Sequence, residues 1–145
     1  MIFGENFSKI IVLIFLLILA THAIAIYFSL YWIIWWFDNA MHFLGGLCLS
    51  FFAIWLIYFA KKIELGNTSN FFSLIIIVSL VVLGGVFWEF FEFFFDNIIF
   101  GKISGLISLA GHAQLGLVDT MSDLFFDLLG GLLGGLLFLK KHDKK

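Results

Sequence analysis

The sequence lacks proline and arginine, contains one cysteine, and has charged side chains at only 12% of its 145 positions. Without proline, no proline kink interrupts a helix. The single cysteine, Cys48, excludes an intramolecular disulfide and argues against a cysteine-based metal site. The net charge of −2 and the absence of a basic run before the C-terminal tail give no support to a nucleic-acid partner. A soluble domain carries about 25% charged residues, so neither a soluble enzyme nor a disordered chain is expected.

The composition is strongly apolar. The hydrophobic fraction is 63%, the mean hydropathy is +1.13, and the chain has 21 phenylalanines and five tryptophans. A globule of this length keeps a large fraction of its surface exposed and could not bury so much apolar area in water. The sequence therefore predicts an integral membrane protein, organised as one membrane domain over residues 1–145.

Four segments are long and apolar enough to cross a membrane, which takes about 20 apolar residues in a helix. Charged residues or short polar stretches separate them. We expect helices at residues 8–29, 39–60, 71–94 and 118–139, with a short tail at 140–145. The predicted fold class is all-α: a polytopic bundle of four transmembrane helices. The chain stays apolar beyond the small residues near Ala23, so cleavage as a signal peptide is not expected.

Lysine distribution predicts the topology. With four spans, both termini and the loop 61–70 share one side, and that side holds every lysine except Lys102. The positive-inside rule makes this side cytoplasmic and places the protein in the cytoplasmic membrane. The opposite side carries the aromatic stretch Trp32–Asp38 and the glycine-punctuated stretch 96–116. We expect the latter to be an interfacial outer loop or a short in-plane helix.

Ionisable residues recur at helical spacing inside or beside the spans. Asp38 and His42 are four apart, and the other two sets are Glu89, Glu92, Asp96 and Asp119, Asp123, Asp127. Each set falls on one face of its helix. At about 1.5 Å of rise per residue, His42, Glu89 and Asp123 lie roughly 24–27 Å from the cytoplasmic helix ends. Three helices thus bring a histidine and carboxylates to one layer near the outer interface.

The same count places His22 and Asp127 at similar depth, roughly 18–20 Å up, so these two side chains are expected to meet. In our interpretation His42, Glu89 and Asp123 are metal ligands, and Asp127 holds orientation together with His22. Glu92 and Asp119 are additional or supporting ligands, and thus catalytic candidates with Asp127. Further candidates are Asp38, and His112 with Gln114 in the outer loop.

Structural roles compete with these assignments. Asp119 lies at a helix start, where an acid can cap the helix and complement its dipole. Glu92, Asp96 and Asp38 can be solvated by head-group water, and His22 can serve as an interhelical hydrogen-bond partner. Capping does not explain Asp123 and Asp127, which lie one and two turns inside the span.

Carboxylates in a low dielectric must be protonated or neutralised by a cation. Oxygen-rich sites suit Mg²⁺ or Mn²⁺, and a histidine admits Zn²⁺ or Mn²⁺. A divalent metal ion facing the outer leaflet would bind a lipid phosphate and could activate water. We expect binding, hydrolysis or transfer on a lipid or lipid-linked phosphate of the cell envelope. Proton- or cation-coupled transport and a non-catalytic membrane scaffold are the alternatives, so enzyme activity is left open.

Glycine pairs lie within three spans: Gly45-Gly46, Gly84-Gly85, Gly130-Gly131 and Gly134-Gly135. Small residues let helix backbones approach closely. The spacing is equally consistent with a tight bundle inside one chain and with a homodimer through helix 118–139.

The ordered motifs resemble a known family. They are D-N-A-M-H at 38–42 followed by Gly45-Gly46, then W-E-F-F-E at 88–92, and the stretch 119–131 that runs from aspartates into glycines. This order resembles the VanZ-like superfamily of small bacterial membrane proteins and, more closely, its YjdF-type relatives. The resemblance implies a multi-pass cytoplasmic-membrane protein linked to the cell envelope. It also implies signature positions at Asp38, His42, Glu89, Asp119, Asp123 and Asp127.

Overall fold

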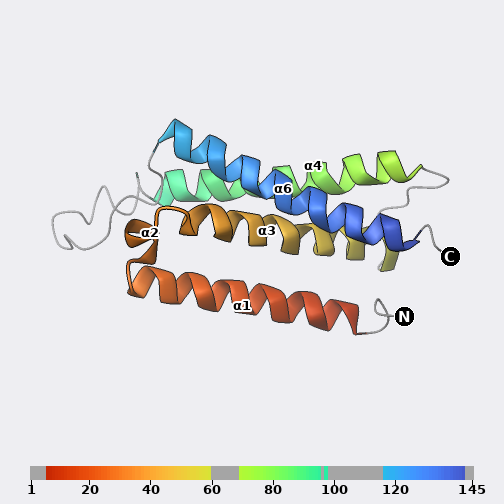
Figure 1. The fold of residues 1–145 in the computed structure, drawn as a ribbon, viewed down its shortest axis with the longest axis horizontal. Helices are drawn as coiled ribbons and strands as arrows, with labels where there is room; N and C mark the ends of the chain where they lie inside the picture. The colour runs from red at the N-terminus through yellow and green to blue at the C-terminus, as the bar shows by residue number, and fades with distance from the viewer. Residues whose placement is uncertain (1–5, 60–68, 96, 98–115, 143–145) are drawn as a thin grey trace.

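A computed structural model describes residues 6–59, 69–95, 97 and 116–142, and all of its regular structure is helical (Figure 1). The main helices are α1 (Phe7–Tyr27), α3 (Phe37–Ile54), α4 (Asn70–Phe94) and α6 (Leu117–His142), with the short α2 (Leu30–Ile33) between α1 and α3. A π-helical segment, η1 (Trp55–Phe59), continues α3. No strand is present in the part of the chain that the structure describes.

Four helices are long and apolar enough to span a membrane: α1, α3 with η1, α4 and α6. The prediction of an all-α, four-span membrane protein is therefore confirmed. The end of α6 differs most from the expected bounds, because the helix continues to His142 rather than stopping at 139 and so includes part of the expected tail. A further difference is at the end of α1, which stops at Tyr27 rather than at 29. The reason is Ser29, whose φ of 58° lies in the left-handed region and breaks the helix before α2 begins.

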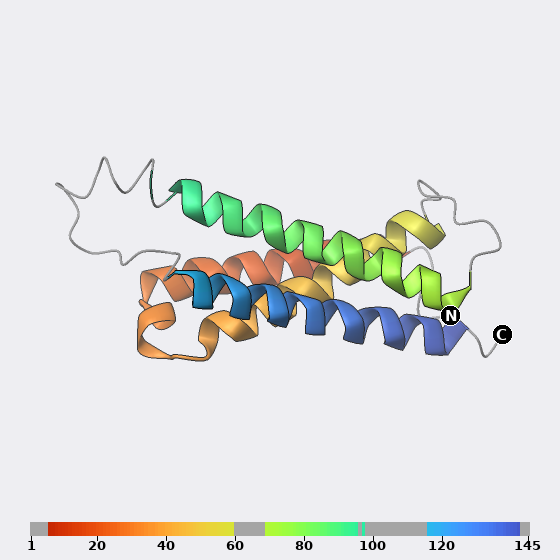
Figure 2. The same ribbon diagram turned by 90° about the horizontal axis from the view of Figure 1, so that it is seen from above.

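The helices run up and down the bundle, and α3 lies between α1 on one side and the α4–α6 pair on the other (Figure 1). Seen from above, α3 runs obliquely beneath α4 and α6 (Figure 2). Phe7, the first residue of α1, packs on Phe59 with ring centroids 5.0 Å apart, and Phe59 also meets Phe138 of α6. The start of α1 and the ends of η1 and α6 thus share one end of the bundle, which we call the apolar end.

The apolar end holds the main hydrophobic core. Its buried members are Phe7, Ile11, Ala53, Ile54, Ile57, Ile77, Phe138 and Leu139. They come from all four spans, so this cluster joins α1, η1, α4 and α6. The remaining apolar side chains mostly face outward, as expected for helices surrounded by lipid.

Close backbone approach occurs where α6 crosses α3 and α4. A Cβ on Gly46 would collide with the backbone of Asp127, and one on Gly130 would collide with the backbone of Phe43. A Cβ on Gly131 would lie 2.9 Å from the side chain of Val81 on α4. These glycines therefore pack within one chain. A homodimer through α6 would have to use its other faces, and it stays a prediction.

Candidate metal centre

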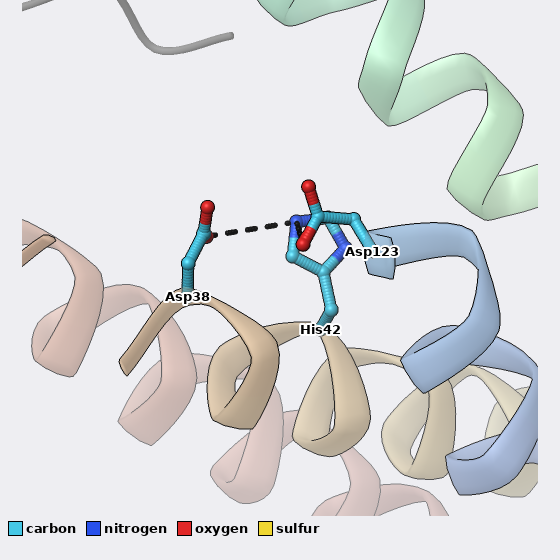
Figure 3. A group of neighbouring side chains, drawn as sticks. All are labelled: Asp38, His42 and Asp123. Atoms are coloured by element: carbon cyan, nitrogen blue, oxygen red, sulfur yellow. Dashed lines mark ion pairs between the residues drawn. The ribbon is translucent and has the colours of Figure 1, made fainter. Parts of the chain in front are cut away.

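His42 lies in the second turn of α3 and is only 6% exposed. Asp38 precedes it by one turn on the same face, and its Oδ1 is 3.7 Å from His42 Nε2. From α6, Asp123 brings its Oδ1 to 3.8 Å from the same nitrogen (Figure 3). Two carboxylates from different helices therefore converge on one nitrogen of a buried imidazole.

The other ring nitrogen has a partner of its own. His42 Nδ1 lies 3.4 Å from Oδ2 of Asp127, one turn further along α6 than Asp123. The i, i+4 spacing of Asp123 and Asp127 thus lets one helix face address both nitrogens of the ring. A hydrogen on Nδ1 would be donated to Asp127, which leaves the lone pair of Nε2 directed at Asp38 and Asp123. Three electron-rich groups facing one another repel unless a cation lies between them.

The Asp123 carboxylate is buried without hydrogen bonds from the described residues. Its exposed fraction is 1%, and within the described residues neither of its carboxylate oxygens accepts a hydrogen bond. Its recorded ion-pair contact is the 3.8 Å approach to His42. A buried carboxylate without hydrogen bonds is costly, so this position calls for a bound cation or a proton.

Glu89 and Glu92 of α4 form a second group with His42. One ligand atom from each of these three residues lies within 4.8 Å of the other two, as do those of Asp38, His42 and Asp123. Glu89 is buried, whereas Glu92 is partly exposed and accepts a 2.9 Å hydrogen bond from Trp88 Nε1. We call these six residues, Asp38, His42, Glu89, Glu92, Asp123 and Asp127, the His42 cluster.

Within the described residues, no lysine lies at the polar end of the bundle beside the His42 cluster. The lysines in the described ranges are Lys9, Lys140 and Lys141, which lie on the terminal turns of α1 and α6 at the apolar end. The chain has no arginine at all. An oxygen-rich group with one imidazole nitrogen is the donor set that Mn²⁺, Mg²⁺ or Zn²⁺ accept.

A cavity of about 240 Å³ adjoins the His42 cluster. Asp38, His42, Glu92 and Asp127 line it at one end, and most of the remaining lining is apolar and comes from α1, α3 and α4. A mostly apolar cavity with a few convergent polar groups is the usual form of a small-molecule site.

The structure brings together most of the residues predicted for the site. His42, Glu89 and Asp123, the predicted ligands, are joined by Asp38 and Glu92, while Asp127 contacts the imidazole directly. Asp119 lies in the first turn of α6 and belongs to neither metal-ligating group. Its position agrees with the competing interpretation, an acid at the positive end of the helix dipole.

The expected contact between His22 and Asp127 is wrong. His22 Nδ1 lies 2.6 Å from the hydroxyl of Tyr31, and its ring packs edge-on against Trp88, while Asp127 contacts His42. Helix rise gives depth along the bundle but not direction around it. Both side chains line the same cavity, yet His22 Nδ1 pairs with Tyr31 and Asp127 Oδ2 pairs with His42.

Tyr31 is a site residue that the sequence interpretation missed, because it sits within an aromatic stretch assigned to the membrane interface. Burial, and the nearby carboxylates of Asp38 and Glu92, raise the pKa of Tyr31 above its ordinary value. The phenol therefore keeps its proton at neutral pH. Its spacing of nine residues from His22, across a helix break, gives no sequence signal for the pair.

Three predicted elements lie outside the described residues. These are Asp96, the outer-loop stretch 98–115 with His112, and Gln114 within that stretch.

Comparison with known proteins identifies the family. The family model described as "Predicted membrane protein (DUF2238)" matches residues 3–144. No curated protein and no solved structure matches the chain. The match supports the YjdF-type part of the resemblance seen in the sequence. Because it spans nearly the whole chain, the protein belongs to the DUF2238 family of membrane proteins, the YjdF-family domain.

Proposed function

We propose that this protein binds a divalent metal ion at the His42 cluster and uses it to bind, and to hydrolyse or transfer, the phosphate group of a membrane lipid or lipid-linked phosphate. The observation that carries the proposal is the Asp123 carboxylate. It is 1% exposed, accepts no hydrogen bond from the described residues, and faces His42 Nε2.

The metal would take His42 Nε2 with Asp38 and Asp123 as ligands. The separations of 3.7 and 3.8 Å suit ligands around one ion, since metal–ligand bonds of about 2.0–2.2 Å place neighbouring donors roughly 3–4 Å apart. Glu89 and Glu92 lie close enough to His42 to complete the coordination. Asp127 would fix the imidazole through Nδ1, as carboxylates commonly do for metal-bound histidines.

The metal also explains how an acidic site would accept a phosphate. The His42 cluster carries five carboxyl groups, so an anionic head group would be repelled without an ion of opposite charge. A bound divalent ion polarises a phosphoryl oxygen and lowers the pKa of a coordinated water. The chain's own residues would hold that ion, orient the imidazole and keep the site largely out of water.

Localisation and wider kinship belong to the same proposal. We propose that the membrane is the cytoplasmic membrane, with both termini in the cytoplasm because the lysines of α1 and α6 lie at the apolar end. The His42 cluster then lies near the outer face, where envelope lipids are handled. A relation to the VanZ-like superfamily, resting on the motif order, would agree with this location.

Cation or proton passage would need polar groups through the rest of the bundle. Between the His42 cluster and the apolar end, the buried polar side chains that the structure describes are Ser50 and Ser73. This sparse relief favours a site closed on one side over a path. A scaffold that binds no ligand would not compensate the free-energy cost of burying the Asp123 carboxylate in the membrane.

The first test is metal content. Purified protein in detergent is dialysed against Mn²⁺ or Zn²⁺, and bound metal is measured by elemental mass spectrometry. We expect about one ion per wild-type chain, since each ligand group shares His42, and loss of that ion in Asp123→Asn and His42→Ala. Asp119→Asn is the matched control, because it removes the same charge from the same helix outside both ligand groups, and it should retain the metal.

The second test is the reaction. Metal-loaded protein is incubated with dodecyl phosphate or a polyprenyl phosphate, and release of inorganic phosphate is followed. Release that requires metal and Asp123 supports hydrolysis, whereas metal-dependent binding without release leaves binding or transfer. Equal metal content in wild type and Asp123→Asn refutes the proposal. Proton or cation flux through liposomes that Asp127→Asn abolishes would establish transport instead.

A further inference from the structure

The cavity beside the His42 cluster is lined mainly by α1, α3 and α4. Phe15 and Leu19 of α1, Gly84 and Trp88 of α4, and Gly45 of α3 are among its lining residues. The ring contact between His22 and Trp88, with centroids 5.6 Å apart, joins α1 to α4 near the polar end. The cavity therefore lies in a slot between α1 and α4.

The slot faces the membrane side of the bundle. Three of its lining residues are substantially exposed: Phe15 is 52%, Leu19 is 42% and Trp88 is 37% exposed. All three belong to helices that span the membrane, so what surrounds them is hydrocarbon rather than water. A molecule entering between α1 and α4 would come sideways from the lipid phase.

The size of the cavity limits the occupant. Its volume of about 240 Å³ exceeds the roughly 150 Å³ of an engineered cavity that binds benzene, and it falls short of the usual ligand pocket of about 300–1,000 Å³. This is room for part of one hydrocarbon chain. Two chains of a diacyl lipid would not fit side by side.

We propose that this slot binds one hydrocarbon chain of an amphiphile whose head group reaches the His42 cluster. The inference rests on the proposed function for the identity of the head group, a phosphate, and adds how the substrate is selected and where it enters. The sources of such a chain are a single-chain lipid phosphate, with its only chain in the slot, or a diacyl lipid that leaves its second chain in the bilayer.

The head group must supply most of the selectivity. A chain that moves from lipid into an apolar slot gains little hydrophobic free energy, because lipid tails are as apolar as the slot. A chain without a head group should therefore not accumulate there. Chain length should matter only while added methylenes still reach the slot, after which binding should level off.

Cys48 provides a reporter inside the slot. It is the only cysteine of the chain, it is buried on α3, and it lines the cavity. The experiment measures the rate of its alkylation by N-ethylmaleimide, read from the intact mass of the full-length protein in detergent with Mn²⁺. Butyl, octyl and dodecyl phosphate are the probes. Protection at a probe concentration of ten times Kd should slow labelling about tenfold.

Gly45 allows the slot to be filled without breaking the fold. A Cβ built on it meets no atom closer than Asp127 Oδ1 at 3.9 Å, whereas a Cβ on neighbouring Gly46 collides with the α6 backbone. We expect Gly45→Leu to slow Cys48 labelling without any probe and to abolish the dependence on chain length. Gly45→Ala should do so partially and provides the test if the larger variant fails to fold. Leu83→Phe, which adds bulk on the outward face of α4, should behave as wild type.

The outcomes separate this inference from the proposed function. Protection by alkyl phosphates that grows with chain length and requires Mn²⁺ supports both. With Mn²⁺ present, protection by dodecylammonium but not by dodecyl phosphate keeps the slot and rejects the metal–phosphate head group. A lysophosphatidic acid that protects better than its diacyl counterpart identifies a single-chain ligand, and equal or better protection by the diacyl lipid shows that one of its two chains enters the slot. The slot is refuted if Cys48 does not react in wild type, or if chain length has no effect with either head group.

Discussion

The two ends of the bundle are built from the same four spans and differ in what they bury. At the apolar end, Phe7, Ile54 and Ile77 pack into a continuous hydrophobic core. At the polar end, α3, α4 and α6 bury His42, Glu89 and Asp123, respectively. Acids within membrane spans cost roughly 2.5–3.5 kcal/mol each on insertion scales. The apolar end accounts for stability, so the cost accepted at the polar end points to a ligand there.

Between the two ends lies the crossing of α3, α4 and α6, where glycines replace side-chain packing. The helix spacing at this crossing sets the distances from Asp123 and Asp127 to His42. It also sets how closely α4 and α6 pack in the hydrophobic core at the apolar end. Changes at the crossing should therefore damage the whole molecule, whereas changes at either end should damage one property only.

The largest effect should come from Gly130→Leu. The added Cβ would collide with the carbonyl oxygen of Phe43 and lie 2.8 Å from the Leu47 nitrogen, both backbone atoms that cannot turn aside. Overpacking typically costs 1–3 kcal/mol, and a backbone collision should cost at least about 3 kcal/mol. We expect loss of the monodisperse peak in size-exclusion chromatography. Gly45→Ala is the control and should elute normally; equal behaviour of the two variants would contradict the close crossing.

A smaller effect, confined to stability, should follow Ile77→Ala at the apolar end. Ile77 is fully buried, so truncation leaves a cavity worth about 2–4 kcal/mol. We expect a lower thermal midpoint in detergent and an unchanged Mn²⁺ affinity. Ile75→Ala, on the outward face of the same helix, should change neither. A loss of Mn²⁺ affinity in Ile77→Ala would show that the two ends are not separable.

Sequence reasoning predicted much of this division. Long apolar runs located the four spans, and helix rise placed His42, Glu89 and Asp123 in one layer, where the structure brings their helices together. Both inferences depend on position along a helix, which a sequence records directly.

Direction around the bundle was not predictable in the same way. His22 and Asp127 share a depth, but α1 lies beyond α3 and meets Tyr31 and Trp88 rather than the inner face of α6. The glycine pairs posed the same problem, because small residues mark a face for close packing without naming the helix that packs there. Azimuth is set by tertiary packing, which local spacing does not encode.

At the polar end, Asp127→Asn should weaken metal binding without removing it. Asp127 contacts His42 Nδ1 rather than the nitrogen that faces Asp38 and Asp123, so it is a positioning residue. Loss of such a partner typically costs 10–100-fold in metal affinity. The asparagine oxygen can still accept a hydrogen bond from Nδ1, whereas alanine cannot. Asp127→Ala should therefore bind the metal more weakly than Asp127→Asn does. Equilibrium dialysis with Mn²⁺ measures both.

The thermal midpoint of metal-free protein separates positioning from folding for this variant. We expect it to stay near the wild-type value in Asp127→Asn, because the amide fits the same space. If Asp127→Asn lost all metal, as His42→Ala should, Asp127 would be a ligand in its own right. If it lost none, the imidazole would not need its help.

The smallest effect should come from Tyr31→Phe, at the boundary between the His42 cluster and the slot. The substitution removes the 2.6 Å hydrogen bond to His22 and should cost about 1 kcal/mol of stability, with Mn²⁺ affinity unchanged. Tyr27→Phe, on an exposed side chain of α1, should cost nothing measurable. A loss of Mn²⁺ affinity in Tyr31→Phe as large as that in Asp127→Asn would place Tyr31 in the metal centre instead.

The stability that Tyr31 contributes should decrease at high pH. The ordinary pKa of tyrosine is about 10, and burial raises that of Tyr31 in the folded protein. The folded state then holds the phenolic proton more tightly than the unfolded state does, so its contribution to stability is complete below about pH 10 and falls as the pH rises further. The stability difference between wild type and Tyr31→Phe should therefore shrink above that pH. A constant difference across this range would mean that Tyr31 is not held in a buried, acid-lined position.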